Sequence, residues 1–136
     1  MTNSSIVALR KSIHSFLIAD AALTEMLNGP RIYDEAPRGT EPPYVTFGDA
    51  RSRDWSTATD RGEEHFVQLD VWSAQRGARQ ALAVATRVQD LLDDGNLSLD
   101  NHTLVNLRFQ QIDTRRENQG RFVRASLRFR AVTEAI

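Results

Sequence analysis

The stretch that most constrains the fold is residues 66–94, where a strand pattern is followed directly by a helix pattern. In the first part, Val67, Leu69 and Val71 alternate with Gln68, Asp70 and Trp72, which is the period of two expected for a half-buried strand. Apolar residues then recur at helical spacing, namely Ala78, Leu82, Val84, Ala85, Val88, Leu91 and Leu92. We therefore predict a strand over 66–74 and an amphipathic helix over 78–94.

The rest of the chain supplies elements on either side of this unit. Ser4 or Ser5 can cap a first helix, and Asp20 can cap a short second helix that Gly29 and Pro30 end. Gly95 is expected to take the left-handed conformation that ends the third helix. The remaining strands are predicted in four places: residues 31–34, the stretch around Val45 and Phe47, residues 102–115, and residues 121–133.

The predicted fold class is α+β, with the order ααβββαβββ. We expect a single domain over residues 1–136, with a largely antiparallel β-sheet and helices packed on one face. In the last two strands, Val105, Leu107 and Phe109, and then alternate residues from Val123 to Ala131, are expected to face the core. The opposite face is left either for water or for a partner. It carries Arg108, Arg124, Arg128 and Arg130, and Asp70 and Trp72 join them if the central strand is a neighbour.

Residues 48–62 contain turn formers and charges without a sustained period. We predict a long hairpin loop there, and such loops in compact domains are usually functional or disordered. Trp55 is its one large apolar residue. It either folds back over the edge of the core or stays exposed as an anchor for a partner.

Composition excludes several classes of protein. There is no cysteine, so neither a disulfide framework nor a cysteine metal site is possible. No stretch approaches the length of apolar sequence that spans a bilayer, and the N-terminus lacks the pattern of a secretion signal, so we expect a soluble, non-secreted protein. The net charge of −1 argues against general nucleic-acid binding, yet the part from residue 101 onward has seven arginines against three acidic residues.

The sequence predicts no catalytic, cofactor-binding or metal-binding residues. His14, His65 and His102 have no metal-ligand spacing. Adjacent acidic residues, such as Glu63 and Glu64, point in different directions on a strand or helix and do not form an acid/base pair. We interpret these acidic pairs as solvated charges.

Four segments carry a resemblance to a known family. They are ADAALTEMLNGPRIYDEAPRGTEPPYVTFG (19–48), LDVWSAQRGARQALAVATRVQDLLD (69–93), the LVNLRFQ strand and the GRFVRASLRFRA ending. In this order they resemble the tail terminator, or tail completion, family of long-tailed phages, prophages and gene transfer agents. The 48–62 region departs most from the family pattern.

The resemblance implies a structural virion protein without enzymatic activity. Members of the family pack helices on a β-sheet and assemble as a six-fold ring on the head-proximal end of the tail tube. The implied partners are further copies of the chain, the tail tube protein, and the head-completion or stopper protein, with no membrane and no sequence-specific nucleic acid. DNA passing through the ring is compatible with this. The implied location is the bacterial cytoplasm during assembly and then the virion or tail particle.

Ring assembly directs attention to charged and aromatic surface residues, because a cyclic ring needs two different, complementary patches on each subunit. The hypothetical interface set is Arg108, Arg124, Arg128, Arg130, Asp70, Trp72, Asp90, Asp93, Asp94 and Trp55. The acidic helix end of one subunit would meet the arginines of the next, or these arginines would face the tube. Two alternatives remain: another connector component or a tube-like subunit, and a small enzyme whose site is formed by assembly.

Overall fold

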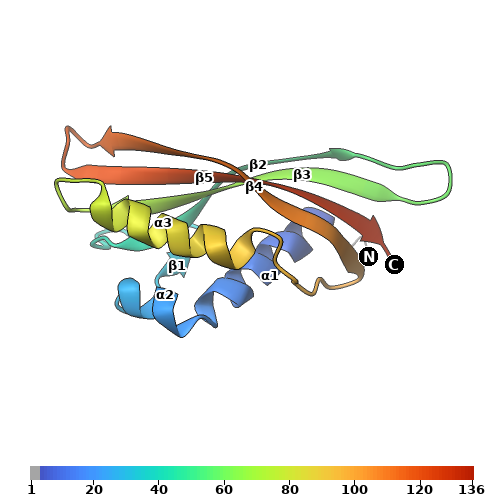
Figure 1. Ribbon diagram of the computed structural model, residues 1–136, viewed down its shortest axis with the longest axis horizontal. Coiled ribbons are helices and arrows are strands. Elements are labelled where there is room, and N and C mark those ends of the chain that lie inside the picture. Colours follow the sequence, from blue (N-terminus) through green and yellow to red (C-terminus); the bar gives the residue numbers. More distant parts are fainter. Residues whose placement is uncertain (1–3) are drawn as a thin grey trace.

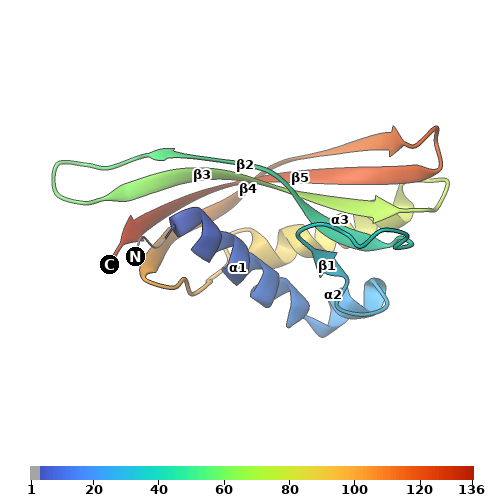
Figure 2. The same ribbon diagram turned by 180° about the vertical axis from the view of Figure 1, so that it is seen from behind.

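The computed structural model describes residues 4–136, which form a long twisted sheet with a layer of helices on one face (Figures 1 and 2). The helices are α1 (Ser5–Ile18), α2 (Ala21–Met26) and α3 (Arg79–Leu92). The strands are β1 (Ile32–Tyr33), β2 (Tyr44–Asp54), β3 (Gly62–Ser73), β4 (His102–Glu117) and β5 (Phe122–Ala135). The predicted α+β class, with a mostly antiparallel sheet, is confirmed.

The strand order across the sheet is β1-β2-β3-β5-β4. The strand predicted over 66–74 is β3, and it lies at the centre of the sheet. Only the short β1–β2 pair is parallel, and all other neighbouring strands are antiparallel. The predicted order listed three strands after α3, and the described residues contain two, β4 and β5. These are 16 and 14 residues long and pair along almost their whole length, so the region 102–135 forms one hairpin.

Local sequence explains where α1 and α2 begin. The Ser4 hydroxyl accepts a hydrogen bond from the Val7 backbone N–H at 3.4 Å, and the Asp20 carboxylate accepts one from the Leu23 N–H at 2.9 Å. Each of these satisfies a backbone donor that the first turn of a helix leaves free. The Asp20 carboxylate also binds the Arg87 guanidinium, at 2.6 and 2.9 Å, and so fixes α2 to α3.

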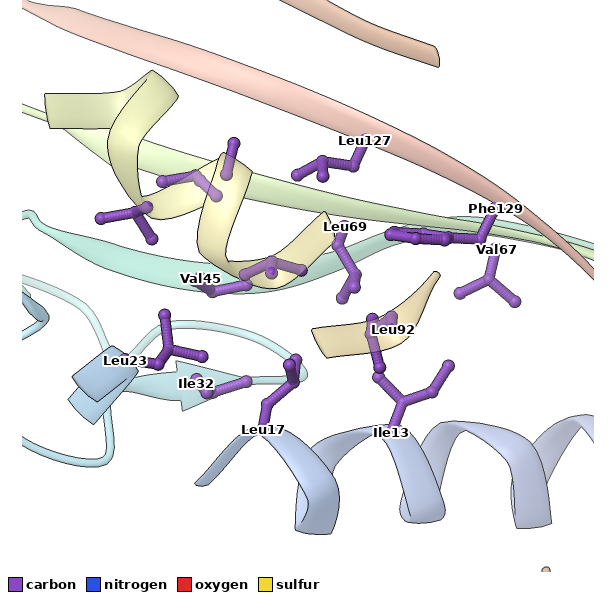
Figure 3. Packing of buried hydrophobic residues seen from close by; sticks show 14 of the residues in the cluster. Ile13, Leu17, Leu23, Ile32, Val45, Val67, Leu69, Leu92, Leu127 and Phe129 are labelled. Atoms are coloured by element: carbon purple, nitrogen blue, oxygen red, sulfur yellow. The ribbon is translucent and has the colours of Figure 1, made fainter. Parts of the chain in front are cut away.

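The core lies between the sheet and the helices (Figure 3). Alternate residues of β3 and β5 point into it, with Leu69 paired opposite Leu127 and Val67 opposite Phe129, all of them buried. The helices contribute further fully buried side chains, among them Leu9, Ile13, Leu17, Leu23, Val88 and Leu92. The period of two in β3 thus sets which side chains the helices cover.

Two predicted core residues lie elsewhere. Leu82 is 38% exposed, because the buried stripe of α3 is centred on Ala81, Ala85 and Val88 instead. Val105 is 49% exposed, since a β-bulge between Leu104 and Asn106 leaves it out of the alternation that a regular strand would keep.

The end of α3 also differs in detail from the prediction. Asp94, with φ of 58°, takes the left-handed conformation expected of Gly95. Gly95 is required for a different reason, because a Cβ there would lie 2.9 Å from the Leu91 carbonyl oxygen and 3.1 Å from that of Leu92. The glycine therefore allows the chain to pass close to the last turn of the helix.

The long loop predicted over 48–62 is mostly strand. β2 continues to Asp54 and β3 starts at Gly62, so only residues 55–61 connect them. We call residues 50–64 the arm, since this hairpin extends beyond the helix layer at one end of the sheet (Figures 1 and 2). Its β2 residues from Asp49 to Asp54 are exposed. A two-sided exposed hairpin has no core face, which is why its sequence lacks a sustained hydrophobic alternation.

Truncating the central strand should destabilise the domain far more than truncating α3 where it is exposed. We expect Leu69→Ala to lower the free energy of unfolding by about 2–5 kcal/mol, because it leaves a cavity in a packed core. Leu82→Ala, the same change at a surface position, should stay within about 0.5 kcal/mol. Urea unfolding followed by circular dichroism measures both. Equal losses in the two variants would contradict the core assignment.

Candidate functional site

The sheet face turned away from the helices, here called the outer face, carries the predicted interface residues of the strands. Along β3 and β5 the register places Trp72 opposite Arg124, Asp70 opposite Ser126 and Gln68 opposite Arg128. This alternation puts long polar side chains side by side over a hydrophobic sheet. The structure therefore brings Asp70, Trp72, Arg124, Arg128 and Arg130 together, as the sequence predicted.

These side chains are connected to one another within the subunit. The Asp70 carboxylate accepts hydrogen bonds from the Ser126 hydroxyl at 2.6 Å and from the Gln68 amide at 3.0 Å. The Arg128 guanidinium donates to the Gln68 carbonyl oxygen at 3.2 Å. Asp70 is only 5% exposed. The middle of the outer face is therefore a row of side chains already connected by hydrogen bonds, here called the ladder: Gln68, Asp70, Ser126 and Arg128.

Next to the ladder, on the side of Trp72, the outer face carries aromatic side chains. Trp72 stacks on Tyr44, and its indole N–H donates to the Thr46 hydroxyl at 3.0 Å. Arg124 lies over the Trp72 ring, 5.4 Å from its centroid, and pairs with Glu117 at 2.9 Å. Such contacts hold a guanidinium in place and leave its charge near the surface.

The base of the arm contains the most buried charge on this face. Glu64 is 3% exposed and binds two guanidiniums, Arg53 at 2.5 Å and Arg130 at 2.6 Å. Burial by itself would raise the pKa of Glu64, but the hydrogen bonds from Arg130 and Arg53 outweigh it and hold that pKa below its ordinary value. The interpretation of this carboxylate as a solvated charge was wrong. A sequence cannot reveal that Arg53 and Arg130 converge on it from two different strands.

Glu64, Arg53 and Arg130 form a triad of paired charges. Trp55 lies over this triad and is 46% exposed. The guanidinium carbons of Arg53 and Arg130 lie 5.3 and 5.4 Å from its ring centroid. The residue therefore neither covers the core nor stands free, because it is held in position by the two arginines that Glu64 fixes. An aromatic side chain that is immobilised and half exposed is suited to act as an anchor for a partner.

The acidic end of α3 has a local explanation. The Asp93 carboxylate accepts a hydrogen bond from the Phe109 backbone N–H at 2.9 Å and lies 3.5 Å from Arg108, while the Asp94 N–H donates to the Leu107 carbonyl at 2.7 Å. These bonds occupy part of the free edge of β4. Asp90 and the Asp94 side chain are exposed. The pairing of this helix end with arginines of another subunit stays a prediction.

His65 is buried on the helix side of the arm base. Its ring nitrogens lie 2.6 Å from the Ser52 hydroxyl and 2.9 Å from the Thr133 hydroxyl, and its burial lowers its pKa. Among residues 4–136 no group of three or more histidine, cysteine, aspartate or glutamate side chains could hold a metal ion. Nor does that part of the chain contain a helix long and apolar enough to cross a membrane.

Comparison with known proteins decides the family. The model of the family described as tail completion protein gp17 matches residues 11–134. The chain belongs to this family of tail completion proteins. The resemblance noted in the sequence is thereby confirmed. A comparison with curated proteins finds no match.

A solved structure is similar over nearly the whole chain. A chain from the "Virion of native gene transfer agent (GTA) particle" superposes with a TM-score of 0.90 at 31% sequence identity. The match covers 98% of this chain and 100% of that one. This tail completion protein is thus similar over nearly its whole length to a chain of a gene transfer agent virion particle.

Low pH should reduce the stability that Glu64 contributes where the arm joins the rest of the sheet. Since the pKa of Glu64 is depressed in the folded state, its contribution to stability is present above its unfolded value of 4.5 and is lost as the pH falls through the folded value. Denaturant unfolding of the wild type from about pH 8 to about pH 3 should show this loss, and Glu64→Gln should reduce the slope below about pH 4.5.

His65 provides the internal control for this measurement. Because the pKa of this buried histidine is lowered, stability also falls as the pH drops below its unfolded value of 6.5. That earlier loss should persist in Glu64→Gln and disappear in His65→Gln. An identical pH dependence in the wild type and Glu64→Gln would contradict the role assigned to the carboxylate.

Proposed function

We propose that this chain forms a homohexameric ring at the head-proximal end of a phage-type tail tube. The ring ends polymerisation of the tube and joins the tail to the head. Its partners are further copies of itself, the tail tube protein, and a head-completion or stopper protein, and DNA can pass through its centre. The chain assembles in the bacterial cytoplasm and then stays in the particle. The observation that carries the proposal is that a chain of a tail completion family matches, over 98% of its length, a chain of a gene transfer agent virion.

The proposed role is structural, without catalysis or a cofactor. A ladder of charged, hydrogen-bonded side chains across one face of a sheet suits repeated docking between proteins, because charge patterns set register and exclude wrong partners. We propose that the outer face, with Arg128 at its centre, docks on the tube or the stopper. The helix layer then faces away from that contact.

The first test is the particle made without this chain. We expect tubes of undefined length and heads without joined tails in electron micrographs, both corrected when the wild-type chain is supplied. In purified form, light scattering and electron microscopy should show closed six-subunit rings, either in solution or on tube ends. Normal tails in the absence of the chain would reject the proposal. Long stacks of the pure protein would favour a tube-like subunit instead.

A second test addresses the outer face. Arg128→Glu reverses a charge in the ladder next to Gln68, and we expect it to reduce head-to-tail joining by at least about tenfold, equivalent to about 1.4 kcal/mol of docking free energy. Arg38→Glu makes the same change at an exposed residue of the loop between β1 and β2, which belongs to no strand of the sheet, and should join normally. Circular dichroism verifies that both variants fold. Equal joining in the two variants would show that the outer face does not dock.

A further inference from the structure

The two ends of the long sheet differ in charge. At one end, the β4–β5 turn and the loop between β3 and α3 lie together (Figure 1), and the Arg116 guanidinium donates to the Arg76 carbonyl at 2.6 Å. We call this the basic end. Its exposed arginines are Arg76, Arg79, Arg115, Arg116 and Arg121. The one acidic residue of the turn, Glu117, is already paired with Arg124.

The turn at the basic end is a well-defined protrusion. Asn118, Gln119 and Gly120 all have positive φ, at 54°, 58° and 84°. Backbone bonds from the Gly120 N–H to Glu117 and from the Arg121 N–H to Asn118, each 3.2 Å, close it. A compact turn presenting flanking arginines can enter a groove with little further loss of conformational freedom.

The opposite end, formed by the arm and the last residues of β5, is acidic. Asp54, Asp60 and Glu134 are exposed there, and Glu63 lies beside them. Arg61 and Arg51 are exposed basic residues of the arm, and Arg51 lies over the Phe66 ring. Arg53 and Arg130 are both paired with Glu64. The two ends of one subunit are too far apart along the sheet to touch each other (Figures 1 and 2). Their complementarity can be satisfied only between molecules.

A groove of about 230 Å³ lies on the outer face at this acidic end. Trp55, Val105 and Val132 supply its apolar surface, and Asp60 and Glu134 line it as carboxylates. Arg130 also lines the groove, and its charge is paired with Glu64. The bulge that exposes Val105 thus forms part of the groove. Among the described residues, the Asn106 side-chain oxygen, which also lines it, is buried without a hydrogen-bond partner. A buried acceptor left unpaired is costly, so a donor entering the groove would be favoured.

We propose that this groove binds the basic end of a second copy of the chain. An arginine of the turn would place its aliphatic stem against Trp55 and Val105 and its guanidinium among Asp60, Glu134 and the Asn106 oxygen. The contact is heterologous, joining two different surfaces of the same subunit, and such contacts form a ring when the rotation from one subunit to the next closes. The proposal rests on the proposed function, because it names the surfaces through which the ring subunits meet.

Disulfide trapping tests the contact directly, since the chain contains no cysteine of its own. Ala58→Cys places a thiol at the arm tip, and Gln119→Cys places one in the turn. When the two variants are mixed and oxidised at high protein concentration, the heterodimer should exceed either homodimer at least tenfold. Glu25→Cys, at an exposed position of α2, is the matched control and should give no such excess with Gln119→Cys. Homodimers in excess, or no heterodimer, would overturn the proposal.

Charge exchange tests specificity. Asp60→Arg with Glu134→Arg reverses the groove, and Arg116→Glu with Arg121→Glu reverses the turn. In the trapping background, each pair of changes made on one side should reduce the heterodimer at least tenfold, and both pairs together should restore it. Trp55→Ala should reduce it without any change of charge. Unchanged trapping in the one-sided variants would overturn the proposal.

The two proposals can fail separately. Six-subunit rings in electron micrographs of the one-sided charge variants would keep the proposed function and reject this interface. Specific trapping in a protein whose absence leaves tails normal would keep the interface and reject the proposed function. Salt provides a further check, because raising it from about 0.1 M to about 1 M shortens the Debye length from about 10 Å to about 3 Å, and trapping should fall accordingly.

Discussion

The structure depends on β3, the strand at the centre of the sheet, because one of its faces lies in the core and the other lies on the outer face. Val67, Leu69 and Val71 point into a core closed by α1 and α3, and burial of these side chains supplies the main driving force for packing the two layers. The intervening residues necessarily point the other way. They carry the outer-face ladder, with Asp70 at its centre. One alternation therefore determines both the stability of the domain and the surface it offers.

Rigidity of the exposed surface follows from polar contacts with that central strand. Glu64 is held by arginines of β2 and β5, and those same arginines hold Trp55 in place. A buried carboxylate is tolerated only when it is paired and hydrogen-bonded, and here both of its oxygens have guanidinium partners. The arm has little core of its own, so its base is fixed by this triad on the outer face and by the contacts of His65 with Ser52 and Thr133 on the other face. A surface fixed in this way can dock without first having to become ordered.

A subunit that assembles head to tail needs two different ends, and the long sheet keeps its two ends apart. The arm connects β2 to β3 and the turn connects β4 to β5, at opposite ends of the same sheet, so opposite charges on them are separated by the length of the sheet (Figure 1). An isologous contact would bring like charges together, whereas a head-to-tail contact brings unlike charges together. This arrangement is consistent with a subunit that assembles in one direction around a ring.

The sequence alone determined the α+β class, the central strand followed by its helix, and the caps at Ser4 and Asp20, because these depend on the spacing of residues close in the chain. It also indicated that Arg124, Arg128, Arg130, Asp70 and Trp72 share a face, since alternation fixes direction once strands pair. Only the tertiary structure decided which strands are neighbours, and therefore that Glu64 is buried, that Val105 leaves the core at a bulge, and that residues 48–54 extend β2. Each of these depends on contacts between residues far apart in sequence, which local periodicity does not encode.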